Sequence, residues 1–290
     1  MILKSHKETI VPKGDPAMSH PKTRYQPTEI APDTFLIHNH EGEGEAPVSV
    51  ALNTVLIRAA EPVVVDTGMK ENRDDYFEDL FSLVEPEDIR WVFISHDDVD
   101  HTGNLNMLMD VAPNATLLVN WFMATRMGAS LEVSPARQRW IGDGDSFSVG
   151  DRALYAIRPP IFDSPTTRGL YDPTTGFYWA SDSFATPMLT PVRDVAEMDE
   201  EFWRDGIHLF DRYVSPWLEL VDDRKFQKTV DRIEALRPTV MAGCHTPAIF
   251  GEHVAKAIAQ SRLSPQGDVA PQPDQAVLEQ IQQALLGLAA

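Results

Sequence analysis

The chain has few basic residues, a single cysteine and no long apolar run. Its 290 residues include 25 Lys and Arg against 44 Asp and Glu, which gives a formal net charge of -19. This balance argues against nucleic acid or an anionic membrane as a partner, because both bind through clustered Lys and Arg. With Cys244 alone, an internal disulfide is excluded, and a reducing compartment is indicated. We therefore expect a cytoplasmic protein.

The sequence also lacks the signals of a membrane or secreted protein. No stretch reaches the roughly 18 uninterrupted apolar residues that a membrane-spanning helix requires. The first residues, MILKSHKETIVPKGD, have no continuous apolar segment of the kind found in a signal peptide. Neither membrane insertion nor secretion is expected.

What the chain does contain is a mixture of strand and helix patterns over most of its length. Apolar runs rich in β-branched residues, such as VSVALNTVLIRA, alternate with segments of helical spacing, such as ENRDDYFEDLFSLV, and the second half repeats the mixture. This predicts an α/β protein with two sheets and helices outside them, an αβ/βα four-layer sandwich. We expect a polar arm at 1–28, one domain at 29–262, and a Pro/Gln-rich linker with a terminal helix at 263–290.

The segment FISHDDVDHTGNL, residues 93–105, places acidic residues and histidines directly after an apolar strand pattern. A buried carboxylate without a partner is strongly unfavourable, so a cluster at a strand end requires something that neutralises it. A metal ion would do so, with ligands drawn from His96, Asp98, Asp100 and His101. The alternative interpretation is a solvated acidic loop with incidental histidines.

At these residues the chain resembles the metallo-β-lactamase superfamily, whose motif HxHxDH opens a dinuclear site at the edge of an αβ/βα sandwich. The resemblance covers roughly residues 30–260. Three further landmarks occur in the order of that superfamily: Asp66 in VVVDTG, Asp182 in ASDSF and His245 in MAGCHTP. The resemblance implies a four-layer sandwich of the metallo-β-lactamase type.

The sequence departs from the hydrolase motif at Asp98, which stands where the second histidine would be. A carboxylate there is similar to the HxExDH motif of the flavodiiron proteins and their flavin-free relatives, the oxygen-binding diiron proteins. In that branch a metal-binding histidine precedes the bridging aspartate. Here RPPIFDSP occupies its place, with Asp163 in the histidine's position and Phe162 as the alternative alignment.

The resemblance implies seven metal ligands: His96, Asp98, Asp100, His101, Asp163, Asp182 and His245. His96, Asp98 and Asp163 would hold one ion, and we call them the first set. The second set, Asp100, His101 and His245, would hold the other ion, and Asp182 would bridge the two. Three imidazoles and four carboxylates favour iron over zinc, with manganese also compatible, because oxygen-rich sites suit harder ions.

Other residues near these motifs have two interpretations each. His38 and His40 would lie over the site or in a solvated loop. Cys244 would be a thiol near the metal or a small apolar core residue, which is the usual behaviour of a buried cysteine.

Three functions are compatible with such a site. A diiron centre would act on O2 or NO, with electrons from a separate partner protein, since nothing after residue 260 resembles a flavodoxin domain or a phosphate-binding loop. A metal-dependent hydrolase would act on an ester, thioester, lactone or lactam through a metal-activated hydroxide. A diiron sensor would register O2 without turnover. We favour the diiron oxidoreductase with a small-molecule substrate, and a homo-oligomer is compatible with the terminal helix.

Overall fold

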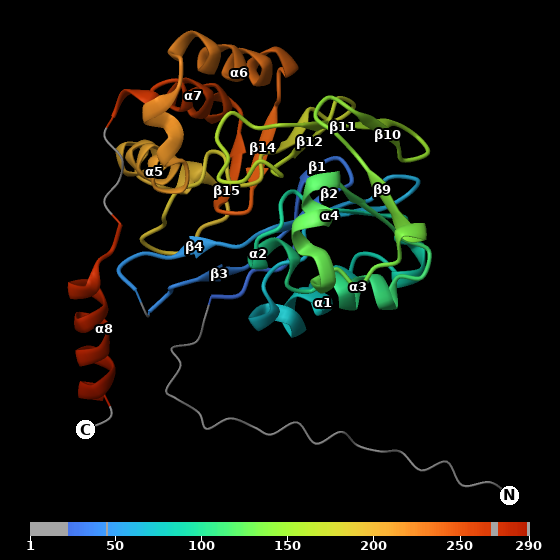
Figure 1. Cartoon of the computed structure of the whole chain (residues 1–290), viewed down its shortest axis with the longest axis horizontal. Coiled ribbons are helices and arrows are strands. Elements are labelled where there is room, and N and C mark those ends of the chain that lie inside the picture. The colour runs from blue at the N-terminus through green and yellow to red at the C-terminus, as the bar shows by residue number, and fades with distance from the viewer. Residues whose placement is uncertain (1–22, 45, 268–271, 289–290) are drawn as a thin grey trace, which may run out of the picture.

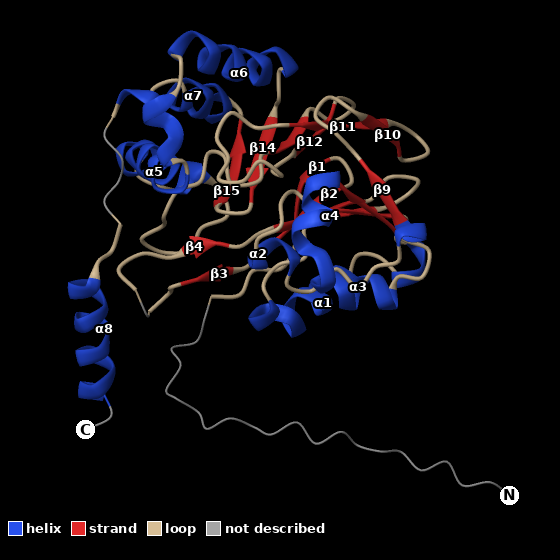
Figure 2. Cartoon of the chain, viewed as in Figure 1, coloured by secondary structure: helices blue, strands red, loops and turns tan. Residues whose placement is uncertain are grey.

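Two β-sheets face each other in the computed structural model, which describes residues 23–44, 46–267 and 272–288 (Figures 1 and 2). The first sheet has the strand order β1 (Thr28–Ala31), β2 (Thr34–Ile37), β5 (Thr54–Ile57), β6 (Val63–Val65), β7 (Trp91–Phe93), β8 (Thr116–Val119) and β9 (Gln138–Trp140). The second sheet has the order β10 (Ser146–Ser148), β11 (Ala153–Ile157), β12 (Gly169–Asp172), β13 (Phe177–Trp179), β14 (Val240–Gly243) and β15 (Thr246–Phe250). The short strands β3 (His40–Glu41) and β4 (Val50–Ala51) pair only with each other and form a separate two-stranded sheet.

Helices cover the outer face of each sheet. The first sheet carries α1 (Arg73–Phe81), α3 (Leu105–Val111) and α4 (Trp121–Met127), and the second carries α5 (Glu200–Val214), α6 (Asp223–Leu236) and α7 (Glu252–Ser261). The layers are therefore helix, sheet, sheet and helix, which confirms the predicted αβ/βα sandwich. Among the described residues, no helix combines the length and apolar character needed to cross a bilayer.

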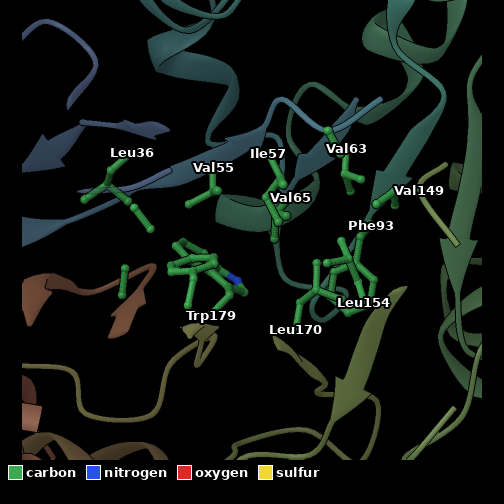
Figure 3. Close-up of a cluster of buried hydrophobic side chains, with 14 of the residues drawn as sticks. Leu36, Val55, Ile57, Val63, Val65, Phe93, Val149, Leu154, Leu170 and Trp179 are labelled. Atoms are coloured by element: carbon green, nitrogen blue, oxygen red, sulfur yellow. The ribbon is translucent and has the colours of Figure 1, made fainter. Parts of the chain in front are cut away.

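Alternating side chains explain why short runs such as VVV are buried on both faces. Val63 and Val65 point into the core between the sheets, whereas Val64 points outward under the helices. In the same inter-sheet core, Trp179 of the second sheet meets Leu36 and Val55 of the first (Figure 3). Strands covered on both faces read as continuous apolar runs, because each successive side chain finds a packed layer.

The segment that follows residues 96–98 (HDD) forms two helices, α2 (Val99–Thr102) and α3. Gly103 lies at the break, and the chain after β6 passes close to it. A Cβ atom on Gly103 would come within 2.6 Å of the carbonyl oxygen of Gly68 and of the amide nitrogen of Lys70. Only glycine permits that approach, which holds the end of α2 against the loop that follows β6.

Residues 1–22 of the predicted arm lie outside the described residues. Residues 23–27 are described, and they pack on the body: the Tyr25 hydroxyl donates to the Pro191 carbonyl at 2.8 Å, and Arg24 Nη1 lies 3.0 Å from Asp79 Oδ2. Strand β1 begins at Thr28, the last residue of the predicted arm. The terminal helix α8 (Gln275–Leu288) stands away from the sandwich in Figure 1. The division into arm, domain and C-terminal segment stays a prediction.

Candidate metal centre

Six of the seven predicted ligands follow the carboxyl ends of strands from both sheets, and Asp163 lies in the loop between β11 and β12. His96 follows β7, which is parallel to β6 and β8, and its loop leads into α2. Asp182 follows β13, and His245 follows β14, which is parallel to β13. Because the ends of parallel strands meet at one edge of a sheet, the two sheets bring these side chains together at one edge of the sandwich.

Within the first set, His96 Nε2 faces both carboxylates. It lies 3.6 Å from Asp98 Oδ2 and 3.9 Å from Asp163 Oδ1. One donor atom from each of the three residues lies within 4.8 Å of the other two. The spacing suits three ligands around one ion.

The second set is tighter and more deeply buried. Asp100 Oδ2 lies 3.4 Å from His101 Nε2 and 3.2 Å from His245 Nε2. The His101 side chain has no exposed surface, and those of His245 and Asp100 are 13% and 17% exposed. This half of the cluster is less exposed to solvent than the first set.

Asp182 lies between the two sets and offers one oxygen to each. Its Oδ2 is 3.3 Å from His96 Nε2, whereas its Oδ1 is 3.1 Å from His101 Nε2 and 3.5 Å from His245 Nε2. His101 Nε2 and Asp182 Oδ1 are both buried without a hydrogen bond, because their close approach lacks the angles of one. A cation between these atoms would satisfy both, so the residues present fit a metal centre.

Each of the three imidazoles is oriented through its Nδ1 atom, which leaves Nε2 directed at the cluster. His96 Nδ1 contacts Ser181 Oγ at 3.2 Å, and His245 Nδ1 donates to the Ala51 carbonyl at 2.9 Å. His101 Nδ1 lies 2.9 Å from Asp66 Oδ2. Such partners fix the tautomer and ring orientation of metal-binding histidines.

Asp66 connects the site to both sheets. Its carboxylate accepts hydrogen bonds from the Ser95 amide at 2.6 Å, the Ser95 hydroxyl at 2.7 Å and the Trp179 indole at 3.1 Å. Asp66 has a φ of 57°, and Ser181 beside Asp182 has a φ of 55°. Non-glycine residues in this left-handed region are strained, and such strain concentrates at functional sites.

We expect Asp66→Asn to weaken binding of the ion held by the second set by 10–100-fold, the cost typical of removing an outer partner of a metal ligand. The variant keeps the size of the side chain but loses the charge that holds His101. Equilibrium dialysis with Co2+ or Mn2+ measures the change. The exposed Asp33→Asn is the control, and an unchanged affinity in Asp66→Asn would contradict the role given to Asp66.

The charge of the cluster draws cations into it. Burial alone would lower the pKa of His101, but the surrounding anionic groups raise it well above its usual value. Burial alone would raise the pKa of Asp182, but the three imidazoles hold it well below its usual range. The site therefore gathers positive charge in the form of protons, which a divalent ion would displace.

The first set lies on the open side of the site. The Asp98 side chain is 48% exposed and that of Asp163 is 26% exposed. Burial, and repulsion from Asp182 and Asp98, outweigh the attraction of His96 and raise the pKa of Asp163. Of the two alignments left open by the sequence, the structure brings Asp163 to His96. Phe162 instead packs against the Trp217 ring, with centroids 4.8 Å apart.

Asp97, which is not among the predicted ligands, holds the loop that carries Asp163 in place. Its Oδ2 pairs with Arg126 Nε at 2.9 Å, and its Oδ1 accepts from the Thr166 hydroxyl at 2.6 Å. Arg126 also donates to Ser164 Oγ at 2.9 Å. These contacts tie the HDDVDH segment to residues 164–166, directly after Asp163.

We expect Asp97→Ala to weaken binding of the ion at the first set by about tenfold, as for other outer partners of metal ligands, and to leave the second ion in place. Loss of the Asp97 contacts frees the loop that carries Asp163 without removing a predicted ligand. Two-step metal titration separates the ions. Arg126→Ala should have a similar effect, and adding it to Asp97→Ala should cost little more, because the two residues act as a pair. Equal loss of affinity at both metal positions would contradict the role given to Asp97.

A solvated loop, one of the two interpretations of His38 and His40, is wrong. Both are buried, and their Nε2 atoms contact Thr28 Oγ1 at 3.0 Å and Glu43 Oε2 at 2.9 Å. Burial lowers the pKa of His38 to about 4, so its ring is neutral. Thr28 and Glu43 are not among the predicted ligands, and these histidines have structural partners of their own.

The fold has close counterparts among solved structures. A rubredoxin oxygen:oxidoreductase from Desulfovibrio gigas superposes with a TM-score of 0.73 at 15% identity, over 83% of this chain and 62% of that one. A structure described as the peroxy diiron species of the chemotaxis sensor ODP superposes with a TM-score of 0.63 at 19% identity, over 81% of this chain and 93% of that one. Both likenesses show the fold.

Sequence comparison gives relatives with the same domain. A putative diflavin flavoprotein A 2 from Nostoc sp. is 30% identical over 133 residues, which are 46% of this chain and 23% of that protein. The chain spans about half or less of the curated relatives that it matches first. The family profile described as ODP family beta lactamase matches residues 50–246, which is more than half of the chain. The chain therefore belongs to the ODP family of beta lactamases, a flavodiiron-like branch of the metallo-β-lactamase fold.

Proposed function

We propose that this protein holds a dinuclear non-haem iron centre that reacts with O2, as an oxidoreductase supplied with electrons by a separate protein. The observation that carries the proposal is the pair of carboxylates, Asp98 and Asp163, that face His96 where zinc hydrolases of this fold rely on histidine. Oxygen-rich donor sets suit iron or manganese better than zinc. The names of the similar proteins, an oxygen:oxidoreductase and a diiron sensor, agree with iron and O2.

In this proposal the seven residues divide as the sequence implied. The first set holds one ion, the second set holds the other, and Asp182 gives an oxygen to each. When bound, two ferrous ions would supply electrons to O2, and the carboxylates would favour the oxidised state. Asp66, Ser181 and the Ala51 carbonyl keep the imidazole Nε2 atoms directed inward.

The open side of the site determines where a small molecule would enter. Asp98 and Asp163 are 48% and 26% exposed, whereas the side chains of the second set are at most 17% exposed. A diatomic gas needs no wide pocket, so O2 or NO would reach the cluster beside the first set. A larger ester or lactam would have to bind over the same two carboxylates.

The proposed chemistry is tested by metal analysis and exposure to O2. Protein produced with iron should contain close to two Fe per chain, and the reduced protein should change its visible absorption when O2 is added. Two zinc ions per chain, together with turnover of esters, thioesters, lactones or lactams, would instead make it a hydrolase. That outcome would overturn the iron proposal, because four carboxylates would then be supporting a Lewis-acid site.

A second measurement separates an enzyme from a sensor. With an added electron donor, an oxidoreductase consumes many equivalents of O2 or NO per iron pair. A sensor reacts once and stops. NO and O2 are compared in parallel assays, since both are diatomic ligands of ferrous iron. If the protein reacts only once with O2 or NO, whichever electron donor is added, it is a sensor and not an oxidoreductase.

A further inference from the structure

Cys244 lies beside the second set, and the fold fixes its position there. It follows the last residue of β14, its side chain is fully buried, and it is the one cysteine in the chain. Its amide donates to the Ser181 carbonyl at 2.9 Å, and its carbonyl accepts from the Asn53 amide at 2.9 Å. Both backbone groups of Cys244 are thus paired, one with a residue after β13 and the other with the residue before β5, which fixes the position of its Cα atom between the two sheets.

The sulfur faces a carboxylate of the site. Cys244 Sγ lies 3.7 Å from Asp100 Oδ2, the oxygen that is also 3.2 Å from His245 Nε2 and 3.4 Å from His101 Nε2. One donor atom from each of these four residues lies within 4.8 Å of the other three. With metal–nitrogen and metal–oxygen bonds of about 2.0–2.1 Å and a metal–sulfur bond of about 2.3 Å, neighbouring donors around one ion lie roughly 3–3.7 Å apart. The three spacings from Asp100 Oδ2 are in this range, and such an ion could bind the Asp182 oxygen as well.

Two further features indicate that the four residues surround a ligand position. His101 Nε2 and Asp182 Oδ1 are buried and make no hydrogen bond, and both border the second set. The contact between the Cys244 thiol and Asp100 is one that an ion would replace, because a metal takes the place of the thiol proton. Cys244 also packs in the apolar core between the sheets, so its sulfur lies at the boundary between that core and the cluster.

We propose that Cys244 is a thiolate ligand of the ion held by Asp100, His101 and His245, so that the two ions have unlike donor sets. This inference rests on the proposed dinuclear centre. The first set offers nitrogen and oxygen alone, whereas the second adds sulfur. The second position therefore takes thiophilic divalent metals, such as Fe2+, Co2+, Zn2+ and Cd2+, in preference to Mn2+, because soft thiolate selects them.

Cobalt spectroscopy on the metal-free full chain tests the inference. Addition of Co2+ should produce the near-ultraviolet sulfur-to-cobalt charge-transfer band, and X-ray absorption should find a sulfur neighbour at about 2.3 Å. Cys244→Ser should remove the band and the sulfur neighbour while cobalt stays bound. Asp98→Ala, which alters the first set, is the matched control and should keep both signals.

The outcomes separate this inference from the proposed function. Two bound ions with no charge-transfer band and no sulfur neighbour would overturn the thiolate ligand alone. Failure of the wild-type chain to bind any of these metals would overturn both. A band that persists in Cys244→Ser would also refute the assignment, since the variant contains no other cysteine. The wild-type spectra decide the matter even if the variant folds poorly.

Discussion

Replacing Asp182 by Asn is expected to reduce the metal content of the protein from two ions per chain to one or fewer. Asp182 Oδ2 faces His96 of the first set, and its Oδ1 faces His101 and His245 of the second set. An asparagine amide keeps one oxygen and presents an NH2 group to the other position. Removing one charge from a buried cluster costs about 3–5 kcal/mol. That loss corresponds to roughly two to four orders of magnitude in the dissociation constant.

Metal analysis after dialysis against a fixed free concentration of Fe2+ or Mn2+ gives the measurement. The matched control is Asp211→Asn, a buried carboxylate on α5 that lies outside the seven ligands. Asp211 lies next to Phe210, whose ring centroid is 5.4 Å from that of His245. The control therefore tests whether any change of charge close to the site, and not only one at a ligand, lowers the metal content. If Asp182→Asn kept two ions with unchanged affinity, Asp182 would not bridge them, and the pairing of the two sets would have to be redrawn.

Much of the site could be predicted from the sequence because its ligands obey a local rule. A carboxylate or histidine directly after a buried strand lies at a sheet edge wherever the strand packs, so His96, Asp182 and His245 needed little knowledge of the tertiary structure. Asp163 required more. It follows no strand directly, and its assignment as a ligand stays a prediction from spacing in a resembling family; in the fold its Oδ1 lies 3.9 Å from His96 Nε2.

The partners of the ligands could not be predicted, because they come from distant parts of the chain. The Trp179 indole that donates to Asp66 is 113 residues away in the sequence, and the Ser181 hydroxyl that contacts His96 is 85 residues from it. Asp97 looks like its neighbour Asp98 in the sequence. Whether the Asp97 side chain turns toward the predicted ligands or toward Arg126 depends on where α4, which carries Arg126, packs.

Strands β9 and β15 lack the local signals of strands, so the sequence pattern alone does not predict them. Strand β9 has the sequence QRW, with two exposed residues, and β15 begins Thr246–Pro247. Both are edge strands of their sheets, where a proline or an exposed polar residue is tolerated because one side of the strand has no partner. Their strand character comes from pairing with β8 and β14, and propensity alone does not provide it.

Asp211→Asn is expected to make the protein more stable above neutral pH and to leave its stability unchanged near pH 4. Burial raises the pKa of Asp211 to about 7, although the hydroxyl of Ser264, in the turn Ser264–Gln266, donates to its Oδ2 and opposes the rise. Its Oδ1 is buried without a hydrogen bond. The folded chain therefore holds this proton far more tightly than an unfolded chain, in which the pKa is about 3.9.

The sign of the pH dependence follows from proton binding. Below about pH 4 both states carry the proton, and Asp211 has no effect. Between about pH 4 and 7 the unfolded state binds fewer protons than the folded state, so stability falls as pH rises. Above pH 7 the loss is constant, at no more than about 4 kcal/mol for three pKa units. Asparagine never ionises, so the variant escapes this loss.

Chemical denaturation of the metal-free wild type and variant across pH 4–8.5 measures the effect as a difference, in which the titration of the shared metal-site residues cancels. The stability gained by Asp211→Asn should grow from zero to a few kcal/mol over this range. Ser264→Ala removes the hydroxyl that stabilises the charged carboxylate, so it should steepen the loss in the wild-type background and have little pH-dependent effect when combined with Asp211→Asn. A difference that does not vary with pH would show that Asp211 keeps an ordinary pKa in the fold, with water or another group satisfying its free oxygen.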